Sequence, residues 1–528
     1  MDGLPLALEL AAARAKVLSL PELADALAAG RFDLLAGGPR AARSQHRTIR
    51  ASVEWSYQLL EPEERGLLRA LAVVAGGCDL SAVAALCPPP STSVVALDLV
   101  DRLLAKSCLV AERQPTGTRY RILETIRQYA AERLAAHLDE WTIANARHAA
   151  HYLRLAEELN SRLRGAELPQ VLGRMTAEHD NLRAAITWLT SEGADGMAAL
   201  RLARALWRYC CLRGHYAEGR RWLRAALRLG QDAGSGAEPE LMAAALDGAA
   251  ALAHRACDYG EATALGQRAL ELYRGLRDRR GTALALTTLG SIAREQADYP
   301  RAIRLHSEAL ALFRRVDDGL GVGHSLQLLG FDSWLSGDLK TASGWSQRAL
   351  RTLTAIGDRE RIAHTLLDRG AEAFYLDDDG AARHLHAARR LFTELGVKQG
   401  LAWADDLLAL VDLRRGDLLT ALDRLTSSLR LHHQVGDRWR QASVLESLAR
   451  VAASLGAARA CGDLLGMAGA IRTAIGAPAP ACERELLTQT TDWLRDAAGP
   501  TAGGWAGPPS LPVVARHVAE LARLLGGR

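Results

Sequence analysis

Small residues recur at a fixed interval through the second half of the chain, with a period of about 40 residues. Three series share this period and keep a constant offset from one another. Their members are Ala250, Gly290, Gly330, Gly370, Ala409 and Ala449; Ala262, Ala302, Ala342, Ala382, Ala421 and Cys461; and Ala269, Ala309, Ala349, Ser428 and Ala468, with Arg389 interrupting the third series. Leucine and isoleucine at helical spacing lie between them, which predicts amphipathic helices that approach closely at the small residues.

Two kinds of turn divide each period. One carries an acidic residue that an aromatic residue or a leucine follows, as at Asp258 and Asp298. The other contains glycine or aspartate, as at Asp278 and Gly357. Each period therefore predicts a helical hairpin, and stacked hairpins bury the apolar face that one hairpin leaves exposed. We expect one continuous α-solenoid over residues 197–476.

The residues before the repeats show a different pattern, which predicts a winged-helix-like domain at 41–138. Three helical patterns come first, at residues 44–60, 61–74 and 94–106. Two short apolar runs follow, and the turn residues at 113–117 between them predict a β-hairpin. These runs are residues 107–112 and 119–123, and a helix over 124–134 ends the domain. The predicted fold class is mainly α, a winged helix with a small β-hairpin followed by the solenoid.

The remaining parts of the chain have weaker patterns. Residues 1–40 are predicted to be a remnant of a helical subdomain, and residues 139–196 a helical connector to the repeats. Residues 477–528 are predicted to form a C-terminal helical cap that contains a Gly/Pro-rich loop.

The composition excludes several classes of protein. The 528 residues carry 65 basic and 61 acidic side chains, a net charge of +4 that does not indicate a strongly basic nucleic-acid-binding domain. The eight cysteines form no C-x-x-C pair, so neither a zinc site nor a disulfide framework is predicted. No apolar run is long enough to span a membrane, and Glu9 precedes the first basic residue, unlike a signal peptide. We expect a cytoplasmic protein without membrane contacts.

Paired histidines are the remaining candidates for metal binding. They are His148 with His151, His384 with His386, and His432 with His433. No convergent set of Cys, Asp or Glu residues accompanies them, so we predict no metal site and expect exposed histidines on amphipathic helices.

The repeats resemble tetratricopeptide repeats, although the usual unit of that family is about 34 residues. The resemblance depends on Leu289, Gly290, Tyr299, Ala302 and Ala309. It implies a concave groove, lined by the first helix of each hairpin, that binds a protein, a peptide or a small inducer. The candidate groove residues are Arg255, Arg294, His324, Gln327, Trp334, Tyr375, Trp403 and Arg414. The alternative is that tryptophans among them fill the packing between repeats.

Three other segments are similar to the signal-transduction ATPases with numerous domains, the STAND class. The G-L-P-L motif of that class is matched by Gly3, Leu4, Pro5 and Leu6. Residues 47–57 and 119–130 look like segments of its large bacterial, especially actinobacterial, transcriptional regulators. The resemblance implies a winged helix that acts as a regulatory lever, and it implies that Pro5 lies near the adenine of a nucleotide. The alternative is that Gly3 and Pro5 only cap a helix.

The sequence contains no P-loop, the part of a STAND ATPase that holds phosphate. No G-x-x-x-x-G-K-[ST] motif occurs. We therefore expect no enzymatic activity, and ATP or ADP binding only if a longer or partner polypeptide supplies a P-loop domain. The favoured interpretation is a non-catalytic regulatory, signal-sensing protein of the STAND transcriptional-regulator type that binds a partner or inducer through its repeats. A second interpretation is a truncated product of a full ATPase regulator.

Direct DNA binding by the winged helix is a third interpretation. Basic residues lie near its first helix and on its wing, where a DNA-reading winged helix has them. These candidates are Arg43, Arg47, Arg50, Arg119 and Arg121. A solvated face, or packing against another domain, is the favoured explanation, and the nearly balanced charge also disfavours DNA binding.

Overall fold

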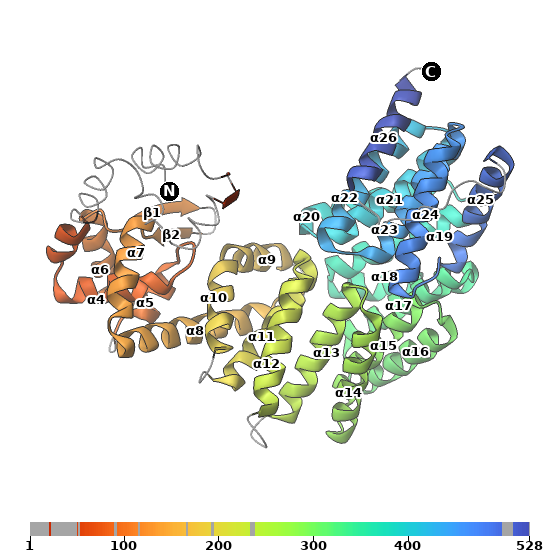
Figure 1. Cartoon of the computed structure of the whole chain (residues 1–528). Helices are drawn as coiled ribbons and strands as arrows, with labels where there is room; N and C mark the ends of the chain where they lie inside the picture. The colour runs from red at the N-terminus through yellow and green to blue at the C-terminus, as the bar shows by residue number, and fades with distance from the viewer. Residues whose placement is uncertain are drawn as a thin grey trace. The chain divides into compact units, whose positions relative to one another are not determined.

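The computed structural model describes residues 53–88, 92–114, 117–164, 167–191, 195–232, 238–498 and 511–526, together with Ser19, Pro21, Glu22 and Arg50. The chain forms two compact units, one of Met1–Ala156 with Arg174–Ala194 and one of Glu157–Gly173 with Asp195–Arg528. Figure 1 shows helices throughout these described ranges, which hold a single two-stranded sheet. The predicted fold class, a mainly α chain with a winged helix and a helical solenoid, is confirmed.

The first unit contains the winged helix. Residues 53–58 are helical, and the elements that follow are α4 (Pro62–Ala70), η2 (Leu71–Val73), α5 (Leu80–Leu86), α6 (Ser93–Ala105), β1 (Val110–Gln114), β2 (Gly117–Arg121) and α7 (Glu124–Ala135). Helix α4 starts at Pro62, where the Glu64 carboxylate accepts a hydrogen bond from the amide of Glu61 at 2.8 Å. The strands pair antiparallel, with Val110 opposite Arg121. Buried core residues include Leu67, Val83, Leu99 and Leu103.

The structure corrects several predicted boundaries in this unit. Helix α5 was not predicted, because seven residues are too few for a helical period to be recognised. Strand β1 begins at Val110 and not at residue 107, because Ser107 has a φ of 56° and lies in the turn after α6. The turn predicted at 113–117 is shorter, since both of its ends belong to strands. A bridge between Cys78 and Tyr120 extends the hairpin.

Helices occupy the segment predicted to connect the two main parts. They are α8 (Leu138–Ser161), α9 (Leu168–Ala177) and α10 (His179–Leu189). The side-chain amide of Asn181 donates to the carbonyl of Gly77 at 2.9 Å and its oxygen accepts from the amide of Ala75 at 2.8 Å. The hydroxyl of Tyr152 donates to Glu178 at 3.1 Å. Helix α10 is therefore part of the winged-helix unit.

The second unit is a solenoid of helical hairpins, stacked in chain order (Figure 1). Its helices are α11 (Gly196–Arg213), α12 (Tyr216–Asp232), α13 (Pro239–Arg255), α14 (Tyr259–Gly275), α15 (Arg279–Glu295), α16 (Tyr299–Arg315), α17 (Gly319–Ser336), α18 (Leu339–Ile356), α19 (Arg359–Tyr375), α20 (Ala381–Leu395), α21 (Lys398–Arg415), α22 (Leu418–Val435), α23 (Arg438–Ser454) and α24 (Ala458–Ile475). Odd-numbered helices are the first helices of hairpins, and even-numbered helices are the second.

Three further elements follow the hairpins: η4 (Ala481–Glu483), α25 (Arg484–Ala498) and α26 (Leu511–Gly526). Helix α25 packs against α23 and α24, and α26 packs against α22. None of the described helices combines the length and the apolar character that crossing a membrane requires.

Aspartates in both kinds of turn begin the helices of the solenoid. The Asp258 carboxylate accepts from the amide of Glu261 at the start of α14. Asp278 accepts from the amide of Gly281 at 2.9 Å and begins α15. The same cap recurs at Asp298, Asp318, Asp338, Asp358, Asp417 and Asp437. Each such cap stabilises a helix by about 1 kcal/mol, so the repeated aspartates fix where the hairpins start and turn.

The small-residue series are buried where the helices meet, with one correction. In α20 the buried residues are Ala381 and Ala388, whereas Ala382 is only partly buried. The second series therefore contains Ala381 in place of Ala382. The third series contains Ala388 at the place where Arg389 appeared to interrupt it. In the turn before α20, Gly380 takes the place of the usual capping aspartate.

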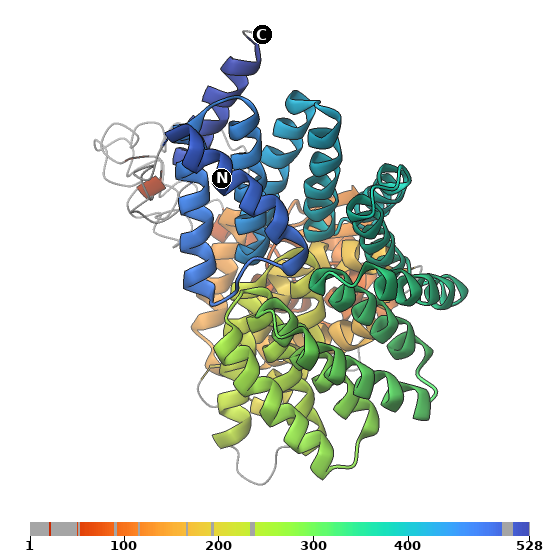
Figure 2. The same ribbon diagram turned by 90° about the vertical axis from the view of Figure 1, so that its right-hand side faces the viewer.

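The solenoid curves so far that its first hairpin meets later ones. Figure 2 shows the hairpins turning about a common axis. Helix α11 contacts α21, and Arg208 of α11 forms an ion pair with Glu360 of α19 at 2.5 Å. Near the other end, η4 lies against α17, and the amide of Ala481 donates to the Tyr299 hydroxyl at 3.3 Å. The first helices thus face one another across a common axis, and contacts between distant hairpins cross the groove that they line.

Candidate functional site

First helices from seven hairpins of the described solenoid surround a cavity of about 170 Å³. Its charged and aromatic lining residues are Trp207, Arg208, His254, Arg255, Arg294, Glu295, His324, Phe331, Glu360, Arg361, His364, Trp403, Asp437, Trp439 and Arg440. An engineered apolar cavity of about 150 Å³ holds one benzene molecule. The axial cavity therefore has the volume for a compact small molecule and not for a folded partner.

The third residue of the first helix differs between repeats in a way that affects the cavity. Gly281, Gly321 and Gly400 occupy this position, and a Cβ atom there would lie 2.1–2.3 Å from an aromatic ring of the preceding helix. The aromatic residues concerned are Tyr273, Phe313 and Phe392. Arg361 and Arg440 occupy the same position in α19 and α23, and both line the cavity. In those two helices the position supplies a guanidinium group to the axis.

Aromatic side chains form one wall of the cavity. The Phe331 ring lies 5.2 Å from the Trp403 ring, and Trp403 lies 6.0 Å from Trp439, both edge to face. The Arg294 guanidinium lies 4.2 Å from the centre of the Phe331 ring, and the Arg440 guanidinium lies 4.9 Å from that of Trp403. These cation–π contacts hold two arginines against the apolar wall.

A group of basic side chains occupies the part of the cavity near α11 and α19. Arg208 donates to Glu360 at 2.5 Å and to the carbonyl of Leu163 at 3.1 Å. Arg255 donates to the neutral side chain of Gln399 at 2.6 Å. Arg361 lines the same region, and no carboxylate of the described residues lies within ion-pair distance of it.

The charges of this group change the pKa values of its members. Burial raises the pKa of Glu360, but Arg208 and Arg361 outweigh burial and lower it to about 2. Burial and Arg361 lower the pKa of His364 to about 3, against the effect of Glu360. Burial, Arg208 and Arg361 lower the pKa of the neighbouring Arg164 to about 10. These three directions agree with an excess of positive charge near Arg208 and Arg361, whereas, against the effect of burial, Glu295 and Asp437 help to raise the pKa of Arg255.

Several buried donors of the cavity wall lack a hydrogen-bond acceptor among the described residues. They are Nε and Nη1 of Arg294, Nε1 of Trp403, Nε1 of Trp439 and Nε of Arg440. Arg294 is 5% exposed and Arg440 is 2% exposed. Buried polar groups in folded proteins are nearly always hydrogen-bonded, so these unpartnered donors are an unusual feature of the residues that line the cavity.

The segment after the last hairpin closes the neighbouring part of the solenoid interior. Glu483 accepts from Arg440 at 2.9 Å and from the hydroxyl of Ser443 at 2.8 Å. Arg472 lies 3.7 Å from the same carboxylate. Arg440 also binds Asp406. The charge of Arg440 is thus balanced by Asp406 and Glu483, whereas Arg361 has no ion-pair partner among the described residues.

The sequence identified part of this cavity. Five of the eight predicted groove residues line it: Arg255, Arg294, His324, Gln327 and Trp403. The other three do not. Trp334 has no exposed surface and stacks on Phe331, and Tyr375 lies 6.3 Å from Trp334, ring to ring. Arg414 is exposed, covers the Phe374 ring at 3.8 Å and pairs with Asp377.

The sequence did not identify Arg208, Glu360, Arg361 or Arg440 as site residues. Arg208 and Glu360 are 152 positions apart, and only the curvature of the solenoid brings them together. Arg361 and Arg440 carried a usable signal, because they replace glycine at one position of the repeat.

Three candidate DNA contacts, Arg50, Arg119 and Arg121, lie among the described residues, and each binds another residue of the protein. Arg119 is 8% exposed and binds Glu178 and the carbonyl of Gly77, which corrects its prediction as a DNA contact. Arg50 pairs with Glu132 at 2.8 Å and Arg121 with Glu112 at 3.1 Å, both partly exposed. Arg43 and Arg47 lie outside the described residues, as does the G-L-P-L segment Gly3, Leu4, Pro5 and Leu6.

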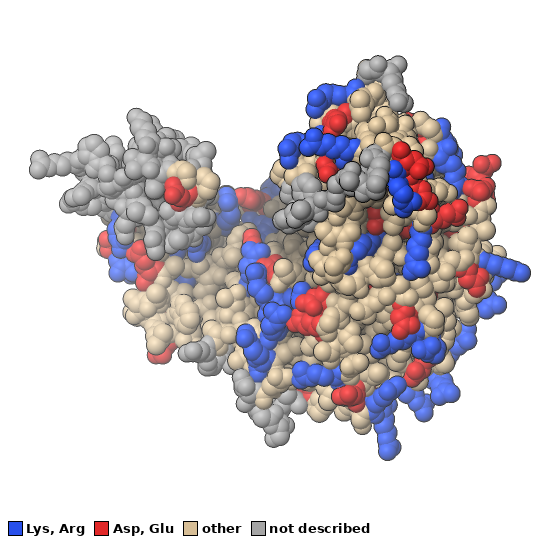
Figure 3. All heavy atoms as spheres, turned by 45° about the vertical axis from the view of Figure 1, so that its right-hand side comes forward, with Lys and Arg blue, Asp and Glu red and all other residues tan. Residues whose placement is uncertain are grey.

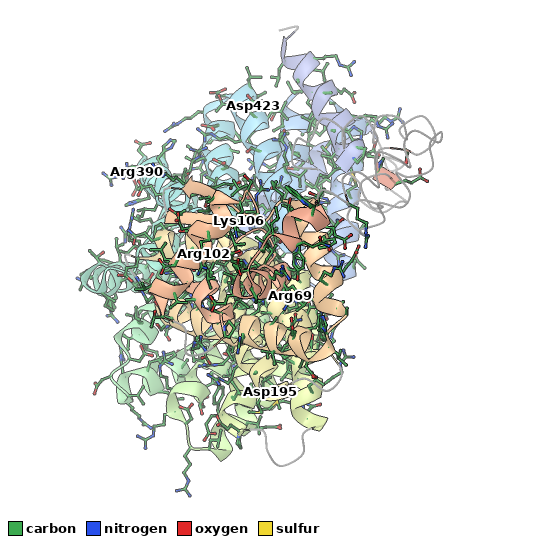
Figure 4. All side chains as sticks on the ribbon, turned by 90° about the vertical axis from the view of Figure 1, so that its left-hand side faces the viewer. Arg69, Arg102, Lys106, Asp195, Arg390 and Asp423 are labelled. Atoms are coloured by element: carbon green, nitrogen blue, oxygen red, sulfur yellow. The ribbon has the colours of Figure 1, made fainter. Side chains whose placement is uncertain are left out.

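Other basic side chains of this unit are paired as well. Lys106 donates to the buried Glu64 at 2.6 Å, and Arg69 donates to Glu140 at 2.7 Å (Figure 4). On the solenoid face seen in Figure 3, basic and acidic side chains are intermixed over the surface. Neither observation adds a basic surface of the kind that DNA binding requires.

Two histidines differ from the prediction that they are exposed. His148 is 2% exposed, and burial lowers its pKa to about 4. His432 has no exposed surface, and its Nδ1 lies 3.4 Å from Asp437. Both are structural histidines of the core.

Comparison with known families supports both parts of the architecture. A tetratricopeptide repeat model matches residues 240–315 and 281–355, and a winged helix-turn-helix model matches residues 60–135. The repeats and the winged helix are therefore of known types.

Proteins of mycobacteria are similar to this chain in sequence. Rv0890c of Mycobacterium tuberculosis and Mb0914c of Mycobacterium bovis, both named as HTH-type transcriptional regulators, are each 40% identical over 228 residues. The match covers 43% of this chain and 25% of each relative, so the chain spans about a quarter of their length. The uncharacterized protein Rv0894 of M. tuberculosis is 40% identical over 137 residues, 26% of this chain and 35% of the relative.

Solved structures are similar at a lower level. A STAND protein with a tetratricopeptide repeat sensor from Pyrococcus horikoshii has a TM-score of 0.39 and 14% identity, covering 94% of this chain and 73% of that one. Aspartyl phosphate phosphatase F from Bacillus subtilis has a TM-score of 0.44 and 12% identity, covering 75% and 90%. These scores are too low to relate the whole chains.

Proposed function

We propose that this chain is the effector-sensing part of a transcriptional regulator and has no catalytic activity of its own. Such a protein needs one domain that binds the effector and another that transmits the response. The repeats and the winged helix are domains of these two kinds. The mycobacterial relatives named as HTH-type transcriptional regulators support the regulatory role.

The observation that carries the proposal is the axial cavity. It brings together aromatic side chains, unpaired arginines and buried donors without acceptors from repeats far apart in the chain. A pocket with an apolar wall and a few convergent polar groups is the usual form of a small-molecule site. Its volume favours a small inducer over a protein or a peptide, the other occupants that the sequence allows.

In a STAND-type regulator, this chain would supply the binding half of the switch. The sequence holds no G-x-x-x-x-G-K-[ST] motif, so nucleotide binding would depend on a P-loop domain in a longer or partner polypeptide. Effector binding to the solenoid would then free the winged helix from that domain. Direct DNA reading is not proposed, because Arg119 is buried in an internal ion pair.

Native mass spectrometry of the full chain, incubated with a small-molecule extract of an actinobacterial culture, tests the proposal. Two variants form a matched pair, because each removes an arginine that covers a phenylalanine ring: Arg294→Gln inside the cavity and Arg414→Gln outside it. We expect the wild type and Arg414→Gln to retain a small-molecule adduct, and Arg294→Gln to retain about tenfold less. No adduct on the wild type, or equal retention by both variants, would reject the cavity as the sensing site.

A further inference from the structure

We propose that the axial cavity binds an organic anion, a carboxylate or phosphate joined to one planar apolar ring. The inference rests on the proposed function, because it assigns a ligand class to the same cavity. Three independent features of the cavity support it: charge, donor geometry and the aromatic wall.

Four arginines lie near α11 and α19, and three of them, Arg208, Arg255 and Arg361, line the cavity. Arg208 has Glu360 as its partner, but no carboxylate of the described residues lies within ion-pair distance of Arg164, Arg255 or Arg361. These three side chains are partly buried, and a cation in such a place without an ion-pair partner gains from a bound anion. The same charges repel a cationic ligand, because the repulsion between like charges is strong in a poorly solvated site.

Four residues that line the cavity, Arg294, Trp403, Trp439 and Arg440, have buried N–H groups that lack acceptors within the described structure. The lining carboxylates Glu295, Glu360 and Asp437 have no such unpartnered oxygen among the described residues. Outside the lining, Asp332 beside Arg294 and Asp406 beside Arg440 each have one, so the surplus of donors is confined to the lining residues. Carboxylate and phosphate are groups that accept several hydrogen bonds and donate none when ionised.

The aromatic wall and the volume define the rest of the ligand. Phe331, Trp403 and Trp439 offer ring faces and edges to a flat apolar group. A cavity of about 170 Å³ is little larger than the roughly 150 Å³ that holds one benzene ring. One ring with one anionic substituent fits this space.

Isothermal titration calorimetry on the full chain tests the inference with four probes of similar shape. They are benzoate, phenyl phosphate, benzyl alcohol and benzylamine, measured at constant ionic strength. We expect benzoate or phenyl phosphate to bind at least about tenfold more tightly than benzyl alcohol, and benzylamine to bind weakest. The better of the two anions tells a carboxylate site from a phosphate site. Inorganic phosphate or acetate that binds as tightly as the ring-bearing anions would overturn the organic part of the proposal.

Variants of Arg361 test whether the charge of this side chain, and not only the shape of the cavity, determines the affinity for the anion. Arg361→Gln should weaken the binding of the preferred anion about tenfold and leave benzyl alcohol unchanged, while Arg361→Lys restores most of the affinity. Arg315→Gln, an exposed arginine on α16, is the matched control and should change nothing. Thermal melting without a probe reports folding, and Arg255→Gln is the second variant if Arg361→Gln melts early.

The outcomes distinguish this inference from the proposed function. Equal affinity for all four probes, or no effect of either arginine substitution, would overturn the anion assignment. If the adduct captured from the extract were neutral or cationic and still required Arg294, the sensing function would stand and the ligand class would be wrong. If no adduct formed and no probe bound, both would be wrong.

Discussion

Glu372 of α19 shows how single buried side chains link this fold to pH. It is 3% exposed and accepts a hydrogen bond from the Ser346 hydroxyl at 2.9 Å, while its other oxygen has no partner among the described residues. Burial raises its pKa from 4.5 to about 7, against the lowering effects of Ser346 and Arg369. The folded chain therefore keeps this proton at pH values where the unfolded chain has lost it.

The stability of the solenoid should fall as the pH rises from about 4.5 to 7, because the unfolded state binds fewer protons than the folded state over that range. Glu372→Gln keeps the shape of the side chain and removes the ionisation. We expect it to raise the free energy of unfolding by about 1–3 kcal/mol at pH 8 and to leave it unchanged at pH 4. Urea denaturation at both pH values measures this. The exposed Asp423 (Figure 4), changed to asparagine, is the control. The same gain at both pH values would contradict the explanation.

At the scale of the helix, glycine at the third position of a first helix is a packing requirement. A Cβ atom on Gly321 would lie 2.2 Å from the ring of Phe313, which is 1% exposed and cannot move aside. Gly344 on α18 has nothing within 4 Å of the same built atom and is exposed. Both glycines are helical, but Gly321 is buried against this ring and Gly344 is exposed.

We expect Gly321→Ala to destabilise the solenoid by about 1–3 kcal/mol through overpacking. Gly344→Ala should stabilise it by about 0.5–1 kcal/mol, because alanine restricts the unfolded chain and favours the helix. Thermal unfolding of the two variants, side by side, measures both effects. A stabilising Gly321→Ala would show that α16 and α17 tolerate a wider separation than the structure has.

The elements that the sequence predicted well are those that local rules determine. Aspartate caps and phase-locked alanines define the hairpins, because each acts within one or two turns of helix. Helix α5 and the start of β1 escaped prediction, since a short helix has no clear period and Ser107 shows no sign of its left-handed backbone. The one-residue shift to Ala381 follows a turn in which Gly380 replaces the usual capping aspartate, and the 40-residue period alone does not predict this shift.

The cavity was predicted only in part, for a reason that belongs to the whole molecule. The register of the first helices placed Arg294 and Trp403 on the inner face, and there they lie. The register did not give the curvature. Without the curvature, the sequence could not predict the contact between Arg208 and Glu360 across the groove. It could not predict the grouping of basic side chains there either.

The contacts across the groove also change how the solenoid should unfold. An open repeat array has contacts between neighbours only, so its parts unfold separately when one interface weakens. Here the buried pair of Arg208 and Glu360 joins α11 to α19, and Arg255 joins α13 to α21 through Gln399. These contacts make each of the first two hairpins depend on the fourth hairpin after it in the chain.

Glu360→Gln tests this dependence. The substitution leaves the buried Arg208 without its counter-charge, which costs about 3–5 kcal/mol. We expect the wild type to unfold in urea in one transition, and the variant in two, with hydrogen exchange of α11 amides accelerating before that of α23. Glu394→Gln removes the partly exposed partner of Arg359 at the start of the same helix and should cost less than about 1 kcal/mol, with one transition. A single, uniformly weakened transition in Glu360→Gln would mean that neighbouring repeats alone hold the solenoid together, and that the axial contacts shape the cavity without coupling its two ends.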